Sequence, residues 1–254
     1  MALSTQELLN FFLIFTRVLA VLMTAPIFSN RTMPTIAKIG FAGLLALLML
    51  PISATADPLP LPTELFPFLL VTAQEVLVGV VIGFASNLVF QAVAIGAGMM
   101  SLQSGFQAAR LFDPFTNASS TALEQFYSLL VIALFLSING HHLLLQALTQ
   151  TFKLVPLGTF ALTEATIGQL VHLTGTIFVN AIRIALPVIG TLLLTDFSLG
   201  LIARAVPQVQ VFFLGLPLKL GLSLMTLALT LSITLPVVRD LLANIPVDLL
   251  SLVK

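Results

Sequence analysis

The residues with the clearest chemical potential are the charged side chains that interrupt long apolar stretches. They are Arg17, Glu75, Arg183, Asp196, Arg204 and Lys219. A charge is costly in hydrocarbon, so each should face a partner or a watery cavity, as on an ion or proton path. The alternative is structural, with salt bridges between helices or charged groups that reach the interface from a helix end. Arg204 and Asp196 fit a helix end, whereas Arg17, Glu75 and Arg183 are the predicted buried charges.

Glu75 and Arg183 lie deepest in their apolar stretches. No second carboxylate stands near Glu75 in the sequence, so we favour structural pairing over a proton path. The sequence leaves open whether Glu75 pairs with Arg17, with Arg183 or with a neighbouring subunit.

The histidines are unfavourably spaced for a metal site. His141 and His142 are adjacent and point to different sides of a helix, unlike a pair four residues apart. No acidic residue stands near enough to complete a ligand set, and the chain has no cysteine. Asn139-Gly140 just before them is a turn signal. The passage therefore predicts a polar break between two half-helices, and we expect no metal or other cofactor.

Enzyme signatures are missing from the sequence. It contains no GxSxG, no P-loop, no GxGxxG after a strand and no HExxH. Without cysteine there is no thiol nucleophile and no disulfide. An intramembrane enzyme also lacks a plausible nucleophile and base, so we expect a protein that is not an enzyme.

Composition indicates a membrane protein. Of the 254 residues, 58% are hydrophobic and 8% are charged, with a mean hydropathy of +1.12, whereas soluble domains are about a quarter charged. Ten basic and ten acidic residues balance, so nothing suggests nucleic-acid binding. Apolar stretches extend from end to end. We therefore predict one all-α domain over residues 1–254, a polytopic hydrophobic helical bundle with broken or kinked helices.

Hydropathy predicts about six spans that must position the charges. They cover residues 8–28, 36–52, 65–100, 122–148, 167–194 and 212–238. We expect the stretch 65–100 to form one long or bent helix or two, and a kink or break near Pro187. The last span should end by Pro236, with a short tail after it. Capping boxes, Ser4 with Glu7 and Thr121 with Glu124, predict two helix starts.

Small residues predict close helix packing. Gly79 and Gly83 form a GxxxG pattern, and Gly96 and Gly98 follow on the same apolar stretch. Glycines at such spacing let helix backbones approach closely, within the chain or against other subunits.

A polar passage from Gln103 to Gln125 holds unexpected apolar residues, Phe106, Leu111, Phe112 and Phe115. Irregular backbone at membrane depth is tolerated only where it is buried in protein or lines a cavity. Such residues can form a hydrophobic constriction that gates a pore. The residues alone favour the simpler alternative, a loop that packs back on its own bundle.

Four long strings resemble the FliR family. They are "RVLAVLMTAPIFSNRTMPTIAKIG", "SLQSGFQAARLFDP", "LFLSINGHHLLLQALTQTFKLVPLG" and "LGLIARAVPQVQVFFLGLPLKLGLSL". The family comprises integral components of the bacterial flagellar type III export gate, related to the SctT proteins of virulence secretion. "FLSINGHH" and "ARAVPQVQVF" are the most specific pieces, and "NGHH" is more similar to the flagellar branch.

The resemblance implies a place in an assembly. FliR-like proteins form a helical ring around an export channel with FliP and FliQ, onto which FlhB docks beside FlhA. The resemblance therefore implies the bacterial inner membrane and the flagellar basal body, with exported flagellar proteins in transit through the channel. It also implies that a loop at residues 105–115 projects into the channel as a plug. The residues concerned are Gly105, Phe106, Arg110, Leu111, Phe112, Asp113, Pro114 and Phe115.

The alternative function is a stand-alone secondary transporter. It would use the intramembrane Glu75 and Arg183 in a substrate or proton site. Transporters often show paired broken helices in matching halves, and no convincing halves are visible in this sequence. Dependence on other subunits distinguishes the two functions.

Overall fold

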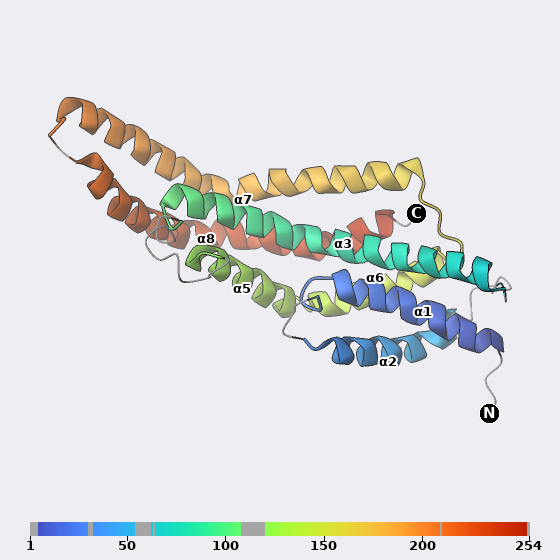
Figure 1. Ribbon diagram of the computed structural model, residues 1–254. Coiled ribbons are helices and arrows are strands. Elements are labelled where there is room, and N and C mark those ends of the chain that lie inside the picture. The colour runs from blue at the N-terminus through green and yellow to red at the C-terminus, as the bar shows by residue number, and fades with distance from the viewer. Residues whose placement is uncertain are drawn as a thin grey trace. The chain divides into compact units, whose positions relative to one another are not determined.

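The described part of the protein is built from α-helices. The computed structural model describes residues 5–29, 33–53, 62, 64–107, 120–208 and 210–252. Within these ranges the elements, shown in Figure 1, are all helices, as predicted, and they are α1 (Thr5–Thr24), α2 (Thr35–Ser53), α3 (Leu65–Ser104), α5 (Ala122–Ser137), α6 (Gly140–Leu154), α7 (Glu164–Ala205) and α8 (Val211–Leu252).

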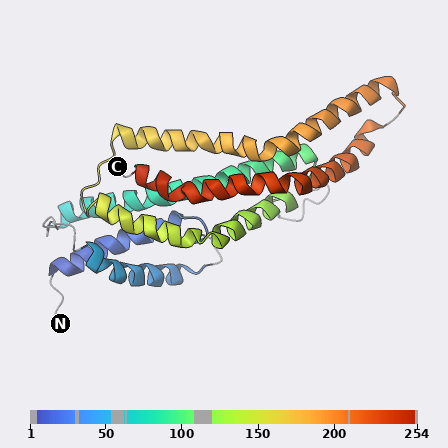
Figure 2. The same ribbon diagram turned by 180° about the vertical axis from the view of Figure 1, so that it is seen from behind.

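The helices are grouped into two compact units. Unit 1 comprises residues 1–88, 139–174 and 243–254, and unit 2 comprises residues 89–138 and 175–242. The three longest helices, α3, α7 and α8, each contribute one part to each unit. In unit 1, α1 lies between α2 and the N-terminal part of α3 in both views (Figures 1 and 2), and α2 also contacts α6. Leu13, Ile14, Val18 and Val21 of α1 are fully buried in this packing.

Local sequence signals mark two helix ends correctly. The capping box at the start of α5 is confirmed, because the Thr121 hydroxyl accepts from the Glu124 backbone while Glu124 Oε2 accepts from the Thr121 N–H at 2.8 Å. The predicted break after α5 is also confirmed. Asn139 adopts a left-handed conformation with φ 56°, and the α5–α6 pair is bent by 66° there. Ser4 of the other predicted capping box lies outside the described residues.

The C-terminal helix corrects one prediction. Instead of ending by Pro236, α8 continues through Pro236 and Pro246 to Leu252. Its last turns carry apolar residues at alternating spacings of four and three, the pattern of a helix with one buried face. These are Val238, Leu242, Ile245, Leu249 and Leu252, all at most 3% exposed. Burial of this face stabilises the helix beyond the prolines, whereas proline statistics alone predict an end.

The number of spans also differs from the prediction of about six. Four described helices are long and apolar enough to cross a membrane, or five if the bent α5–α6 pair counts as one span. The apolar part of α2, Thr35–Pro51, is shorter than the ~20 residues that a span needs. Residues 65–100 belong to one helix of 40 residues, and α7 passes through Pro187 as one helix of 42 residues.

Candidate functional site

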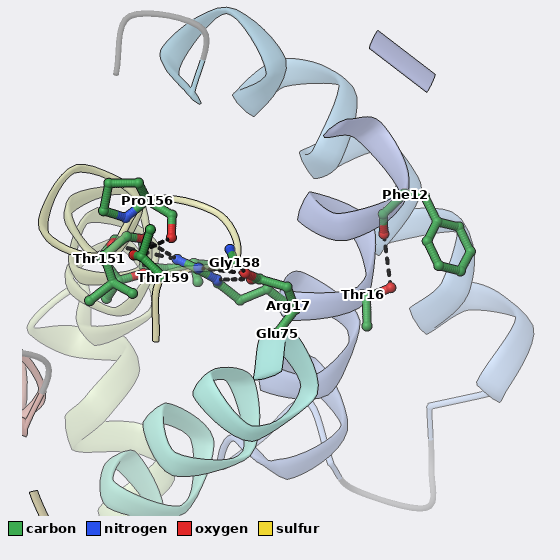
Figure 3. A network of polar contacts seen from close by, with 10 residues as sticks. Phe12, Thr16, Arg17, Glu75, Thr151, Pro156, Gly158 and Thr159 are labelled. Atoms are coloured by element: carbon green, nitrogen blue, oxygen red, sulfur yellow. Dashed lines mark hydrogen bonds and ion pairs between the residues drawn. The ribbon is translucent and has the colours of Figure 1, made fainter. Parts of the chain in front are cut away.

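The centre of unit 1 is a buried ion pair between Arg17 of α1 and Glu75 of α3. Arg17 Nε lies 2.5 Å from Glu75 Oε2, and Arg17 Nη2 donates to Glu75 Oε1 at 3.1 Å. Both side chains are 0% exposed. Figure 3 shows the two side chains meeting head to head between their helices. This is the two-pronged geometry in which a guanidinium binds a carboxylate most strongly, and it answers which partner Glu75 has within the chain.

The remaining donors of Arg17 are directed at the end of α6. Arg17 Nη1 donates to the backbone carbonyl oxygens of Val155 at 3.1 Å and Thr151 at 3.5 Å. Both carbonyls belong to the last turn and cap of α6, where the helix dipole is negative and a cation is favoured. The Phe152 ring lies 4.4 Å from Arg17 Cζ and adds a cation–π contact.

The carboxylate of Glu75 is held by the turn that follows α6. The backbone N–H of Gly158 donates to Glu75 Oε1 at 2.9 Å (Figure 3). Gly158 has φ +74°, and the Thr159 N–H donates to the Pro156 carbonyl at 3.2 Å, which is a four-residue turn with glycine at the position that needs positive φ. A Cβ at Gly158 would also stand 3.1 Å from Val71 Cγ1 of α3. A side chain at Gly158 would therefore strain the turn that presents this N–H to Glu75.

Two glycines on α3 allow the pair to meet. Glu75, Gly79 and Gly83 are four residues apart in turn and so lie on one face of the helix. A Cβ at Gly79 would stand 2.6 Å from the Arg17 carbonyl oxygen, and one at Gly83 would stand 1.8 Å from Thr24 Oγ1. The α1 backbone therefore lies directly against Gly79, and the Thr24 side chain at the end of α1 lies directly against Gly83. This face, with Glu75 four residues before the GxxxG pattern, is a signal that the sequence contained.

The other two glycines lie in unit 2 and differ from each other. A Cβ at Gly96 would stand 2.9 Å from the carbonyl oxygen of Ala181 on α7, so these helices approach closely. At Gly98 the nearest atom to such a Cβ is Glu124 Oε1 at 3.8 Å, an ordinary contact. Space restricts the residue type at Gly96 but not at Gly98.

Arg183 corrects the prediction of three buried charges. It is exposed on α7, unlike Arg17 and Glu75, which are fully buried. Its neighbours on the chain surface are also apolar and exposed, with Ile182 at 48% and Leu186 at 60%. Sequence reasoning placed Arg183 in an apolar helix correctly, but it could not tell that the chain leaves this face of the helix uncovered.

A second polar cluster, which sequence reasoning missed, joins three helices of unit 2. Asp196 of α7 forms an ion pair with Lys219 of α8 and accepts from Gln103 Nε2 of α3 at 2.8 Å. The cluster lines a cavity of about 350 Å³ together with Gly105 and Leu216. Opposite charges in two apolar helices were the available signal. Asp196 lies well inside α7, not near its end as expected, while Arg204 does lie in the last turn.

Of the predicted plug residues, the structure describes Gly105 and Phe106. Gly105 has φ +84°, its N–H donates to the Leu102 carbonyl at 3.2 Å, and the Phe106 N–H donates to the Ser101 carbonyl at 3.1 Å. These two bonds form a Schellman motif, which explains the glycine by the end of α3 alone. Phe106 is half-buried. The other predicted plug residues, Arg110, Leu111, Phe112, Asp113, Pro114 and Phe115, lie outside the described residues.

The histidines show no ligand cluster. The rings of His141 and His142 lie 4.4 Å apart and meet edge to face. No group of three or more histidine, aspartate or glutamate side chains that could hold a metal ion exists in the described ranges.

Comparison with known proteins identifies close similarity over nearly the whole chain. The family "Bacterial export proteins, family 1" matches residues 8–245. The flagellar biosynthetic protein FliR of Bacillus subtilis (strain 168) is 33% identical over 234 residues, which cover 91% of this chain and 89% of that protein. FliR of Pectobacterium carotovorum subsp. carotovorum is 32% identical over 95% of this chain and 91% of that protein. FliR of Escherichia coli (strain K12) is 32% identical over 90% of this chain and 87% of that protein.

Proposed function

The chain belongs to the bacterial export proteins, family 1, and from that membership we propose that it is a channel-forming subunit of the flagellar type III protein export gate. The resemblance to the FliR family is confirmed, and the chain is a component of flagellar export. What goes further, namely the channel, the partner subunits and the plug, is our proposal.

The length of exposed apolar surface along single helices carries the proposal of an assembly. On α3, exposed apolar side chains extend from Leu65, 75% exposed, to Leu102, 65% exposed, about 55 Å at 1.5 Å per residue. The hydrocarbon core of a bilayer is only about 30 Å thick. A tilt of about 40°, the upper end of the usual range, still leaves a projection of about 40 Å.

The same mismatch holds for the other two long helices. Exposed apolar residues extend from Ile167 to Ile202 on α7 and from Phe213 to Val247 on α8, each about 50 Å. Lipid cannot cover such lengths, and soluble surfaces rarely expose large apolar patches. Other protein subunits must therefore cover part of each helix.

The family resemblance suggests which subunits these are. We propose that the chain forms a helical ring with FliP and FliQ in the bacterial inner membrane and the flagellar basal body. FlhB docks onto this ring and FlhA supplies the energised platform beside it. Exported flagellar proteins pass through the channel, and the chain itself acts as a conduit without enzymatic activity or a cofactor.

We assign the plug to residues 105–115. Its support is the sequence pattern of Phe106, Leu111, Phe112 and Phe115 in a polar passage, together with the family resemblance. Apolar side chains in a constriction exclude water and ions. Deletion of residues 106–112 should leave assembly intact and make membranes leaky to ions, measured as dye or potassium release from cells that produce the complete gate. Normal ion tightness in that deletion would exclude the plug.

The alternative of a stand-alone transporter has less support. Glu75 accepts hydrogen bonds at both carboxylate oxygens and is fully buried. A proton or substrate site needs a carboxylate that can exchange its partners with water or ligand. The carboxylate oxygens of Glu75 are instead bonded to Arg17 and to the N–H of Gly158, which favours a structural role for Glu75.

Native mass spectrometry on the tagged chain, gently extracted from its own cells, tests the proposed function. We expect one copy bound to several copies of two other small membrane proteins. A stable monomer or homo-oligomer without partner subunits would overturn the export-gate proposal and favour the transporter.

A further inference from the structure

The outer face of α7 carries an unusual combination of side chains. Residues on the opposite side of the helix, Ala181, Ala185, Val188 and Leu192, are at most 1% exposed and pack into unit 2. At 3.6 residues per turn, the side away from them comprises Val179, Arg183, Leu186, Gly190, Leu193 and Phe197. We call these six residues the outer face. Its four large apolar members are between 50% and 68% exposed.

Arg183 stands alone as a charge on this face. Among the residues that the structure describes, no carboxylate forms an ion pair with it and no group bonds to its guanidinium. A guanidinium at membrane depth is costly unless it is paired or reaches water. Arg183 also lies near the middle of the 42-residue helix, so the ends of the helix offer it no way out.

Lipid alone cannot satisfy both the arginine and its apolar neighbours. Exposed apolar residues continue along α7 from Val171 before Arg183 to Leu201 after it, about 45 Å in total. If hydrocarbon covers the apolar residues both before and after Arg183 along the helix, Arg183 itself lies in the hydrocarbon. If the headgroups lie at Arg183, the apolar residues on one side lie outside the bilayer. Either position requires protein against this helix.

Two glycines leave room for a neighbouring helix at or beside the outer face. Gly190 belongs to the outer face and Gly175 precedes its first residue by about one turn. They lie about two turns on either side of Arg183, and a Cβ at either position would meet no atom within 4 Å. The chain itself therefore does not use these glycines for packing, unlike Gly79 and Gly96. Glycines on an apolar helix permit close approach of another helix, whereas lipid chains gain nothing from them.

We propose that the outer face of α7 binds an apolar helix of another subunit, and that a carboxylate on that helix pairs with Arg183. A carboxylate is the group that bonds most strongly to a guanidinium that such a contact removes from water. The inference rests on the proposed function, because it names the chemistry of one contact within the proposed assembly. Arg183 is thus a positioning residue that fixes the register of two subunits.

Photocrosslinking in the intact assembly tests the contact without altering Arg183. A photoreactive residue replaces Leu186, four-fifths of a turn away, and membranes from cells that produce the whole gate are irradiated. We expect a crosslink to an apolar helix of another subunit, within one turn of an aspartate or glutamate. The matched control replaces Val188, 1% exposed, and should crosslink only within the chain. Crosslinks to lipid alone, or to a helix without a nearby acidic residue, would overturn the proposal.

Charge reversal tests the pairing. Arg183→Glu should lower the amount of chain recovered in the assembly about tenfold or more, as expected when a buried charge faces a like charge. Replacing the crosslinked carboxylate by lysine should restore recovery to within about twofold. The control Arg204→Glu reverses an exposed charge in the last turn of the same helix and should assemble normally. Normal assembly of Arg183→Glu, or failure of the reversed carboxylate to restore it, contradicts the pairing.

These outcomes separate the inference from the proposed function. If Arg183→Glu still assembles with several different subunits, only the pairing is wrong. If the unaltered chain has no partner subunits at all, the proposed function is wrong as well.

Discussion

Arg17 and Glu75 are surrounded by opposite kinds of groups. In addition to Glu75, the guanidinium of Arg17 contacts two carbonyl oxygens and the face of an aromatic ring, all of which carry partial negative charge. Beyond Arg17, the carboxylate of Glu75 faces the N–H of Gly158, a donor. A buried ion pair gains over its desolvation cost mainly when such additional bonds complete both charges. The surroundings therefore fit a cation at position 17 and an anion at position 75, and they do not fit the reverse arrangement.

Loss of the carboxylate should be strongly destabilising. Glu75→Gln keeps the shape of the side chain but leaves the guanidinium of Arg17 buried without a counter-charge, which costs about 3–5 kcal/mol. We expect a lower midpoint of thermal unfolding in detergent and faster proteolysis. The matched control, Glu64→Gln, alters an exposed carboxylate and should change stability by at most about 0.5 kcal/mol. Equal midpoints for the two variants would mean that the ion pair contributes no stability.

Exchanging the two charges tests whether these surroundings matter. In the double variant with Arg17→Glu and Glu75→Arg the charges remain opposite, but a carboxylate then faces the carbonyls of Thr151 and Val155. Two acceptors cannot bond to each other, so the reversed pair should not recover the stability lost in Glu75→Gln. Recovery would show that the pair acts through charge alone. The same unfolding midpoint measures it.

At the scale of elements, close helix contact and ion pairing depend on each other. Gly79 lies on the same face of α3 as Glu75, and its missing side chain lets the α1 backbone approach. Any wider spacing of α1 and α3 stretches the bonds between Arg17 and Glu75. The close approach at Gly79 and the buried ion pair are thus expected to be lost together.

Gly79→Ala tests this dependence. The added methyl group meets the Arg17 carbonyl oxygen at 2.6 Å and Ala20 Cβ at 2.5 Å, so the helices must separate, at a cost of about 1–3 kcal/mol. Combined with Glu75→Gln, the loss should be smaller than the sum of the two, because both remove the same contact. Gly40→Ala on α2, where a Cβ meets nothing within 4 Å, should be neutral or stabilising by up to about 1 kcal/mol. If the stability losses of the two single variants simply add in the double variant, the glycine and the ion pair contribute independently.

The sequence predicted the elements better than their contacts. Local chemistry predicted the capping box at Thr121, the break at Asn139 and the glycines that face another helix, because each depends on neighbours within about one turn. The pairing of Arg17 with Glu75 spans 58 residues, and its carbonyl acceptors lie 134 and 138 residues away. No local pattern contains that information.

The wrong predictions share a physical cause. The end of α8 at Pro236 followed from proline chemistry, but burial of Ile245, Leu249 and Leu252 stabilises the helix past it. Arg183 was predicted to be buried because its helix is apolar on all sides, and such a helix does not reveal which side its own chain covers. Both depend on tertiary packing.

At the scale of the whole molecule, the chain exposes more apolar surface than lipid can cover. The three long helices α3, α7 and α8 each expose apolar residues over about 50 Å or more. Partner subunits that bind only the folded chain would stabilise it by mass action.

The chain should therefore depend on its partners for survival in the cell. In a strain that lacks the partner subunits, we expect the steady-state level of the tagged chain to fall several-fold, because exposed apolar surface directs membrane proteins to aggregation and proteolysis. Pulse-chase labelling measures the half-life. An unrelated polytopic membrane protein of the same strain serves as the control, and an unchanged half-life of the chain would contradict the dependence.

The buried ion pair also sets an order in time for biosynthesis. Arg17 is translated 58 residues before Glu75, an interval of about 3–12 s at the usual rate of about 5–20 residues per second. The carbonyl of Val155 follows Arg17 by 138 residues, which takes about 7–28 s. During the first of these intervals Arg17 lacks the carboxylate that it pairs with in the folded chain. Until Glu75 is made, we expect the first helix to stay in contact with water or with other protein. In a nascent chain whose translation is stalled before Glu75, this helix should therefore be accessible to water-soluble reagents.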